Sequence, residues 1–360
     1  MTATSAPRLS VLDLVPVTSG STASAALAAS TQLARRADEL GFTRYWVAEH
    51  HGMPGVASSS PPVLLAHLAA ATRRIRMGSG GVMLPNHAPL VVAEQFGLLE
   101  ALHPGRVDLG IGRAPGTDQR TAAALRRTVE GLDAEDFPQQ LVDLLAYFHG
   151  PVDGVHAIPA EGNAPDVWLL GSSGYSAQVA GMLGLPFAFA HHFMPQNTLP
   201  ALALYRSTFR PSDLLAEPYA AVCVGVTCAP TTERAQALAE PGALSFLRLR
   251  SGQPGPLPTE AETAAHRWTP AERAFADERL ASQVHRRPGD GPRGPARAGG
   301  GDDGGRADRD HHGAGPGGPG HVVRPGRRPR QHGRRGQPAA AGSRPRLSRA
   351  LDRPRPRLTA

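Results

Sequence analysis

The chain has 360 residues, 41% of them hydrophobic, which is enough for a sizeable core in one large domain or two small ones. It has no run of 18 apolar residues, and its first residues, MTATSAPRLS, lack the apolar centre of a signal peptide, so we expect a cytoplasmic protein and no membrane. The net charge is +7, but residues 1–284 hold 20 basic and 25 acidic residues, which gives no reason to expect nucleic acid as a partner.

After a polar lead over residues 1–8, segments with strand-like and helix-like patterns alternate along the chain. In chain order, strands are predicted over residues 9–17, 43–48, 75–84, 107–111, 167–170, 187–190 and 219–228. Helices are predicted over residues 24–40, 62–72, 89–102, two pieces of 117–150, 173–183, 199–209, 231–239 and 270–283. Gly41, just after the first helix, is a typical C-terminal stop.

This alternation predicts a parallel sheet with helices outside it. A TIM (β/α)8 barrel has eight such units in about 250 residues, and it is the fold that the pattern favours over residues 9–284. Only seven strands are found there, so the eighth βα unit is expected to be missing. The last predicted strand holds Cys223 and Cys228 on opposite faces, which predicts two buried free thiols and no disulfide between them.

The chain changes character over residues 285–360. This segment has no Phe, Trp, Tyr, Glu or Ile, and it holds 18 arginines, 17 glycines and 11 prolines. One interpretation is a disordered Arg/Gly/Pro-rich tail, because such a composition buries too little apolar surface to offset its ordering entropy. The other is out-of-frame translation of a GC-rich gene, since the whole chain has no lysine.

A one-base shift within the degenerate codons supports the second interpretation. Residues 285–295 can then encode IGDPATVRAGL and residues 306–312 ELIVTTM, a helical segment and a strand that would supply the missing eighth unit. Sequencing the gene around codon 285 distinguishes the two. A barrel without its eighth strand has two unpaired edges, so an inactive protein is also an open alternative.

Titratable side chains directly follow two of the predicted strands. Glu49, His50 and His51 end the strand at 43–48, and His191 and His192 follow the strand at 187–190. The carboxyl ends of buried strands are where α/β proteins place their chemistry, although such groups can also simply satisfy buried backbone. A metal-dependent barrel hydrolase, with strand-end histidines as zinc ligands, therefore stays open as an alternative.

Three blocks of sequence resemble one family. They are GFTRYWVAEHH, RIRMGSGGVMLPNHAPLVVAEQFGLLEALHPGRVDLGIGRAPGTD and LLGSSGYSAQVAGMLGLPFAFAHHF. Residues 9–284 are similar to the bacterial-luciferase-like flavin-dependent monooxygenases, and most similar to the LLM class flavin-dependent oxidoreductases. The resemblance implies a TIM barrel, reduced FMN from a separate flavin reductase (or a deazaflavin), O₂ and a small-molecule substrate as partners, and a homodimer.

The resemblance also suggests where the cofactor binds. Glycines in Gly78-Ser79-Gly80-Gly81 allow close approach of a flat ring, and the family supports the flavin ring here through an unusual peptide geometry; an ordinary bulge is the alternative. Arg113 is expected to pair with the FMN phosphate, with a surface salt bridge as the alternative. Three serines that open the next helix are expected to complete the phosphate site, with helix capping as the alternative: Ser172, Ser173 and Ser176.

His50 is the expected catalytic base. A neutral imidazole titrates near the working pH, and the family assigns this role to the matching histidine. Glu49 is expected to be its partner or a wall group of the site. The substrate pocket is expected to include His51, for which a structural role is the alternative, and His191 and His192, with Asn86 and His87 as weaker candidates. Nothing in the sequence identifies the substrate.

Overall fold

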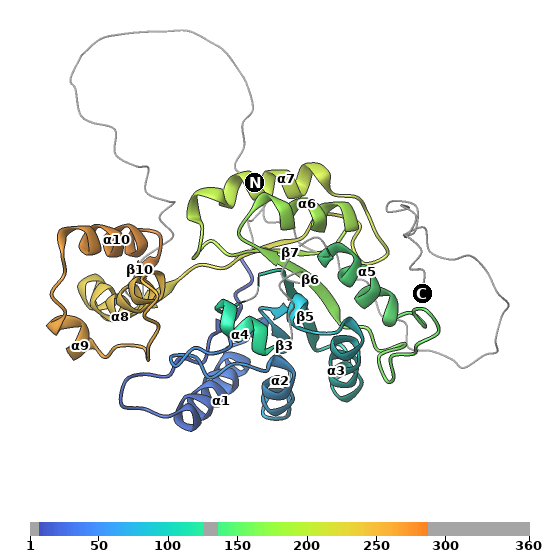
Figure 1. Ribbon diagram of the computed structural model, residues 1–360, viewed down its shortest axis with the longest axis horizontal. Coiled ribbons are helices and arrows are strands. Elements are labelled where there is room, and N and C mark those ends of the chain that lie inside the picture. Colours follow the sequence, from blue (N-terminus) through green and yellow to red (C-terminus); the bar gives the residue numbers. More distant parts are fainter. Residues whose placement is uncertain (1–6, 115, 126–135, 287–360) are drawn as a thin grey trace, which may run out of the picture. The chain divides into compact units, whose positions relative to one another are not determined.

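The central feature of the computed structural model is a parallel sheet, shown in Figure 1. The model describes residues 7–114, 116–125 and 136–286. The sheet path runs β1-β2-β3-β5-β6-β7-β8, and the short β4 pairs with β5. The strands are β1 (Val11–Asp13), β2 (Arg44–Val47), β3 (Arg76–Ser79), β4 (Val82–Met83), β5 (Val107–Gly112), β6 (Asp166–Gly171), β7 (Phe187–Phe189) and β8 (Ala220–Val222).

Helices connect these parallel strands, as the sequence pattern predicts. They are α1 (Ala23–Glu39), α2 (Pro61–Ala70), α3 (Pro89–Leu102), α4 (Gln119–Ala124), α5 (Phe137–Tyr147), α6 (Gly174–Leu183) and α7 (Thr198–Thr208), with single turns η1 (Leu84–Asn86) and η3 (Pro195–Asn197). Figure 1 shows most of them around the outside of the sheet. Local signals fix their ends: Thr22 accepts a hydrogen bond from Ala25 N at the start of α1, and left-handed Gly184 ends α6.

The alternation of side chains along β2 separates two cores. Tyr45 and Val47 belong to the large apolar cluster beneath the helices, whereas Trp46 packs with Trp168 and Ala188 on the other face. Period-two alternation requires this division. The rings of Trp46 and Trp168 meet edge to face, with centroids 5.2 Å apart. The concave face of the curled sheet is therefore a packed aromatic layer.

The sheet confirms the predicted fold class. In the part of the chain that the structure describes, no further strand joins the path after β8, so β1 and β8 remain its edges. The predictions of a disordered tail and of out-of-frame translation concern residues 285–360, of which residues 287–360 lie outside the described residues. None of the described helices is both long and apolar enough to span a bilayer.

Three predicted strands differ in extent, and the one at 75–84 divides into β3 and β4 and ends in η1. The first, at 9–17, is reduced to β1, because Val15 adopts a φ of 53° and its N–H is bonded to Asp13 Oδ1 at 2.7 Å. The last, at 219–228, divides into β8 and β9 (Val226–Cys228), and β9 pairs with β10 (Val284–Arg286) in a separate two-stranded sheet. Both cysteines are free, but the prediction of burial is wrong for Cys228, because β9 lies outside the main sheet and leaves it exposed.

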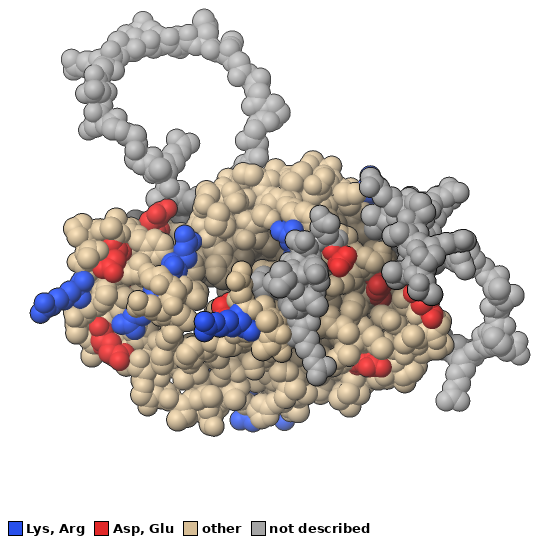
Figure 2. Space-filling model, in the orientation of Figure 1, with Lys and Arg blue, Asp and Glu red and all other residues tan. Residues whose placement is uncertain are grey.

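The chain beyond β9 is mainly helical. It forms α8 (Thr232–Arg250), which continues through Pro241 well past the predicted end, α9 (Glu260–Ala265), which was not predicted, and α10 (Pro270–Ala281). Capping boxes at Thr259 and Thr269 begin the last two helices. Figure 2 shows acidic and basic side chains of the described residues interspersed on one face, without a broad area of one sign.

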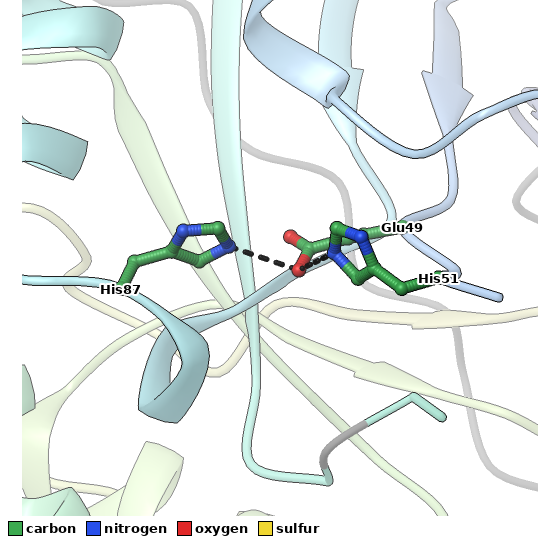
Figure 3. Close-up of side chains that lie close together, drawn as sticks. All are labelled: Glu49, His51 and His87. Atoms are coloured by element: carbon green, nitrogen blue, oxygen red, sulfur yellow. Dashed lines mark hydrogen bonds and ion pairs between the residues drawn. The ribbon is translucent and has the colours of Figure 1, made fainter. Parts of the chain in front are cut away.

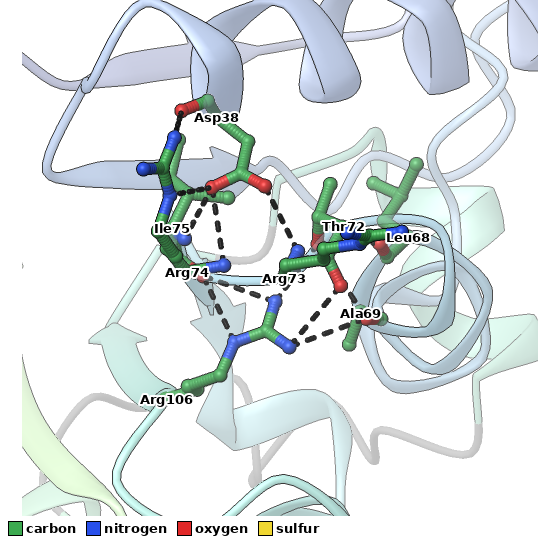
Figure 4. A network of polar contacts seen from close by, with 8 residues as sticks. All are labelled: Asp38, Leu68, Ala69, Thr72, Arg73, Arg74, Ile75 and Arg106. Atoms are coloured by element: carbon green, nitrogen blue, oxygen red, sulfur yellow. Dashed lines mark hydrogen bonds and ion pairs between the residues drawn. The ribbon is translucent and has the colours of Figure 1, made fainter.

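A polar network fixes the turn between α2 and β3 (Figure 4). The carboxylate of Asp38 accepts hydrogen bonds from three consecutive backbone N–H groups, those of Arg73, Arg74 and Ile75, at 2.8–3.1 Å. Arg106 donates to Ile75 O and to Thr72 on the other side of the turn. Burial acts to raise the pKa of Asp38, but the backbone donors outweigh it and lower the pKa.

We expect Asp38→Asn to reduce the free energy of unfolding by roughly 1.5–3 kcal/mol, because the ionised acceptor is lost. Since the pKa of Asp38 is lowered on folding, this contribution is present above about pH 4 and disappears as the pH falls through the folded-state pKa. Urea denaturation at pH 7 and pH 3 measures both effects. Exposed Glu39, paired only with Arg36, provides the control Glu39→Gln, which should change stability little.

Candidate active site

The predicted site residues lie at the same end of the sheet. Glu49, His50 and His51 follow β2, His87 follows β4 and η1, and Arg113 follows β5; Ser172 and Ser173 lead from β6 into α6, and His191 and His192 follow β7. Because the strands are parallel, their carboxyl ends form one rim, where barrel enzymes bind their substrates. We call this end of the sheet the mouth.

Glu49 is the centre of a hydrogen-bond cluster at the mouth. Its side chain is buried, and Oε1 accepts from Nε2 of His51 and of His87, both at 2.9 Å. Asn86 Nδ2 also donates to Oε1, at 3.2 Å, and Met83 N donates to Oε2, at 3.1 Å. Burial acts to raise the pKa of Glu49, but these donors outweigh it and lower the pKa. The cluster therefore holds an ionised carboxylate that joins the segments after β2 and β4.

The same cluster is the one group of metal-ligand type that the described residues bring together. The ligand atoms of Glu49, His51 and His87 lie within 4.8 Å of one another. Figure 3 shows the two imidazoles on either side of the carboxylate, each directed at it. A carboxylate only accepts, so both Nε2 atoms carry protons in this arrangement, whereas a metal would require their lone pairs. The zinc-hydrolase alternative would require His191 and His192 to join this group, and they do not.

His50 has the arrangement of a general base. Its Nδ1 lies 3.1 Å from Gly116 O, and since a carbonyl only accepts, Nδ1 carries the proton of the neutral ring. Nε2 is then the basic nitrogen, and it has no partner among the described residues. Burial lowers the pKa of His50, so the imidazole is neutral at pH 7. The sequence suggested Glu49 as a partner or wall group for His50, but the two side chains share no hydrogen bond. Glu49 accepts hydrogen bonds from His51, His87, Asn86 and Met83 instead.

The loop after β5 connects His50 to the region of Arg113. Besides the contact of His50 with Gly116, Thr117 Oγ1 donates to His51 O at 2.7 Å. Gly116 has a φ of +66°, and a Cβ there would lie 3.1 Å from Glu49 O. The backbone at Gly116 and Thr117 thus passes closely against the end of β2.

Arg113 lies at the N-terminus of α6. Its Cζ is 4.2 Å from the centroid of the Tyr175 ring, in the first turn of that helix. No carboxylate pairs with its guanidinium among the described residues. Ser173 is the N-cap of α6, but its side chain makes no capping hydrogen bond, and Ser176 is buried in the same turn. Neither the surface salt bridge nor ordinary capping therefore explains these residues.

The glycines in and after the last residues of β3 are required by packing within the protein. A Cβ at Gly78 would lie 2.7 Å from Asp108 Cβ, and one at Gly81 would lie 2.7 Å from Gly110 O. The Gly80–Gly81 peptide is cis, and Ser79 Oγ donates to Gly110 O at 2.9 Å and accepts from Gly110 N at 3.0 Å. The Ser79 hydroxyl is thus already used. Contact of this segment with a flavin stays a prediction.

The two histidines after β7 form a separate part of the mouth. His191 Nδ1 lies 2.8 Å from Thr198 Oγ1, and His192 Nδ1 donates to Cys223 O at 3.2 Å. Arg279, from α10, donates to His192 O at 3.0 Å. The structure therefore does not place His51 and His87, which are bonded to Glu49, in direct contact with His191 and His192.

Comparison with known proteins shows the family of this chain. Residues 8–299 match the family model described as luciferase-like monooxygenase. The chain belongs to the luciferase-like monooxygenase family. An uncharacterised Bacillus subtilis protein, YvbT, is 55% identical over 279 residues, which are 77% of this chain and 82% of YvbT. A luciferase-like monooxygenase of Escherichia coli K12 is 48% identical over 277 residues, with coverage of 76% and 82%.

Solved structures show the same fold. Apo-MsnO8 is 41% identical, with a TM-score of 0.67 over 72% of this chain and 78% of that one. The oxygenating constituent of 3,6-diketocamphane monooxygenase, solved with FMN, is 20% identical, with a TM-score of 0.57 and coverage of 68% and 74%. A structural neighbour with F420, 15% identical, also shares the fold. This family membership does not favour the metal-dependent hydrolase.

Two residues that contact predicted site residues were not predicted from the sequence. Tyr175 could have been found, because it lies two positions after Ser173 at the start of a predicted helix. Arg279 could not, since it lies in an ordinary amphipathic helix more than 80 residues from His192, and only the packing of α10 brings them together.

We expect Glu49→Gln to loosen the segment after β4, because an amide cannot accept all four donors that surround the carboxylate. The loss of stability should be roughly 1–3 kcal/mol. Hydrogen exchange at the Met83 amide should become faster than in the unchanged protein. Exposed Glu217 gives the control Glu217→Gln, and equal Met83 exchange in all three proteins would contradict the proposed cluster.

Proposed function

We propose that this chain is a flavin-dependent monooxygenase that uses reduced FMN and O₂ to oxidise a small organic substrate. The observation that supports this most strongly is Arg113 on Tyr175 at the open N-terminus of α6. A guanidinium without a carboxylate partner, next to unused backbone N–H groups and a free N-cap hydroxyl, is a donor set suited to a phosphate.

FMN fits these residues better than a ligand without phosphate. Arg113 would bind the phosphate in a bidentate manner, and the first-turn N–H groups of α6 with Ser172, Ser173 and Ser176 would complete its hydrogen bonds. We propose that the flavin ring extends from there toward Gly78-Ser79-Gly80-Gly81. When bound and reduced, FMN supplies the electrons with which O₂ is activated.

His50 would act as the base that handles one proton in this reaction. Its Nε2 is the free basic nitrogen, and burial keeps it neutral. Glu49 would act through position, holding His51 and the segment after β4 so that the mouth keeps its shape. A separate flavin reductase and a homodimer are further parts of the proposal.

The phosphate site can be tested with two ligands that differ in one group. We expect Arg113→Gln to weaken FMN binding by roughly tenfold to a hundredfold, as for loss of a charged hydrogen bond, and to leave riboflavin binding unchanged. Flavin fluorescence titration measures both. Exposed Arg120 provides the control Arg120→Gln. If Arg113→Gln weakened FMN and riboflavin equally, the phosphate role would be refuted.

The protonation of His50 can be measured directly. Its ring signal in NMR, identified by its loss in His50→Asn, should titrate with a midpoint below 6.5, because burial disfavours the charged form. The neutral base is then present throughout the range above that midpoint. Stability should correspondingly fall as the pH drops below about 6.5, and less so in His50→Asn. A midpoint above 6.5 would contradict this description of the site.

A further inference from the structure

Arg279 is a half-buried cation at the mouth without an ion-pair partner among the described residues. Its Nη1 donates to His192 O at 3.0 Å, directly after β7, and its Cζ lies 3.6 Å from the centroid of the Phe246 ring. Its Nε is buried and has no hydrogen-bond partner. Among the described residues, no carboxylate oxygen lies within the 4.0 Å of an ion pair.

Three other half-buried arginines of this chain have partners for several guanidinium nitrogens: Arg76 and Arg273 contact carboxylates, and Arg106 donates to Thr72 and Ile75 O. Arg76 contacts Asp108 and Asp166, each at 2.6 Å, and these carboxylates outweigh the effect of burial and raise the pKa of Arg76. Arg273, on the same helix as Arg279, contacts Glu240 and Asp277. For Arg279 burial lowers the pKa, with no opposing carboxylate. A desolvated guanidinium without a carboxylate partner is favoured by pairing with an anion.

His192, directly after β7, lies beside Arg279. Burial lowers the pKa of His192, and the positive charge of Arg279 lowers it as well. Aromatic rings cover the other side: Phe193 lies 6.2 Å from Phe246, centroid to centroid. This part of the mouth therefore combines aromatic side chains with a guanidinium that has no carboxylate partner among the described residues.

We propose that Arg279 binds an anionic head group, a carboxylate or a sulfonate, of the substrate that the enzyme oxidises. This inference rests on the proposed function, because only that function makes the bound anion the substrate of the enzyme. Arg113 and α6 already account for a phosphate, and they follow β5 and β6, whereas Arg279 lies against the segment after β7. The substrate would thus have an apolar body with an acidic end, held at the end of a different strand from the flavin phosphate.

Three probes that differ only in the head group test this: octanoate, octane-1-sulfonate and octanamide. We expect FMN-loaded protein to bind the two anions roughly tenfold to a hundredfold more tightly than the amide in calorimetry. Arg279→Gln should bring this ratio to about one, whereas Arg279→Lys and the matched control Arg273→Gln should retain a preference for anions. FMN affinity should be unchanged in Arg279→Gln.

The outcomes separate the two proposals. If the unchanged protein binds FMN but no anion more tightly than octanamide, the inference on Arg279 is overturned and the proposed function stands. If Arg279→Gln loses FMN affinity and riboflavin affinity is retained, the anion is the flavin phosphate, which also overturns the inference. If the protein binds no FMN, the proposed function fails, and the head-group ratio of the chain without FMN still decides the role of Arg279.

Discussion

The buried, ionised carboxylate of Glu49 is the interaction on which the arrangement of the mouth depends. It is the only part of the site whose charge is fully compensated within the described residues, by donors from the segments after β2 and β4. Because it fixes the ends of neighbouring strands, the adjacent His50 is held against the loop after β5 with its basic nitrogen free. Rigid surroundings of this kind are what positions a catalytic base.

The charges that are not compensated are equally informative. Arg113 and Arg279 lack carboxylate partners among the described residues, whereas Arg76 inside the sheet is paired twice. Arg106, at the turn before β3, also has no ion pair, but its guanidinium donates to both Ile75 O and Thr72. Among the described residues, the Arg113 guanidinium makes no hydrogen bond and that of Arg279 makes one. This contrast separates residues that stabilise the fold from residues available to ligands.

Much of this organisation could be predicted from sequence, and for stated reasons. The period of the pattern identified the strands and helices, and parallel strands bring their carboxyl-terminal residues together, so His50 and Arg113 were expected at one mouth. The partners of Glu49 could not be predicted, because its contacts with His51 and His87 depend on side-chain conformations that the sequence pattern does not determine. The division of the strand at 219–228 depends on pairing of β9 with β10, a long-range contact with no local signal.

The account is tested most directly by a crystal structure of the protein with FMN. It predicts the phosphate within hydrogen-bond distance of Arg113 and of the first-turn N–H groups of α6, and the ring between the Gly80–Gly81 peptide and His50. FMN bound away from Arg113, or with its ring remote from His50, would contradict it.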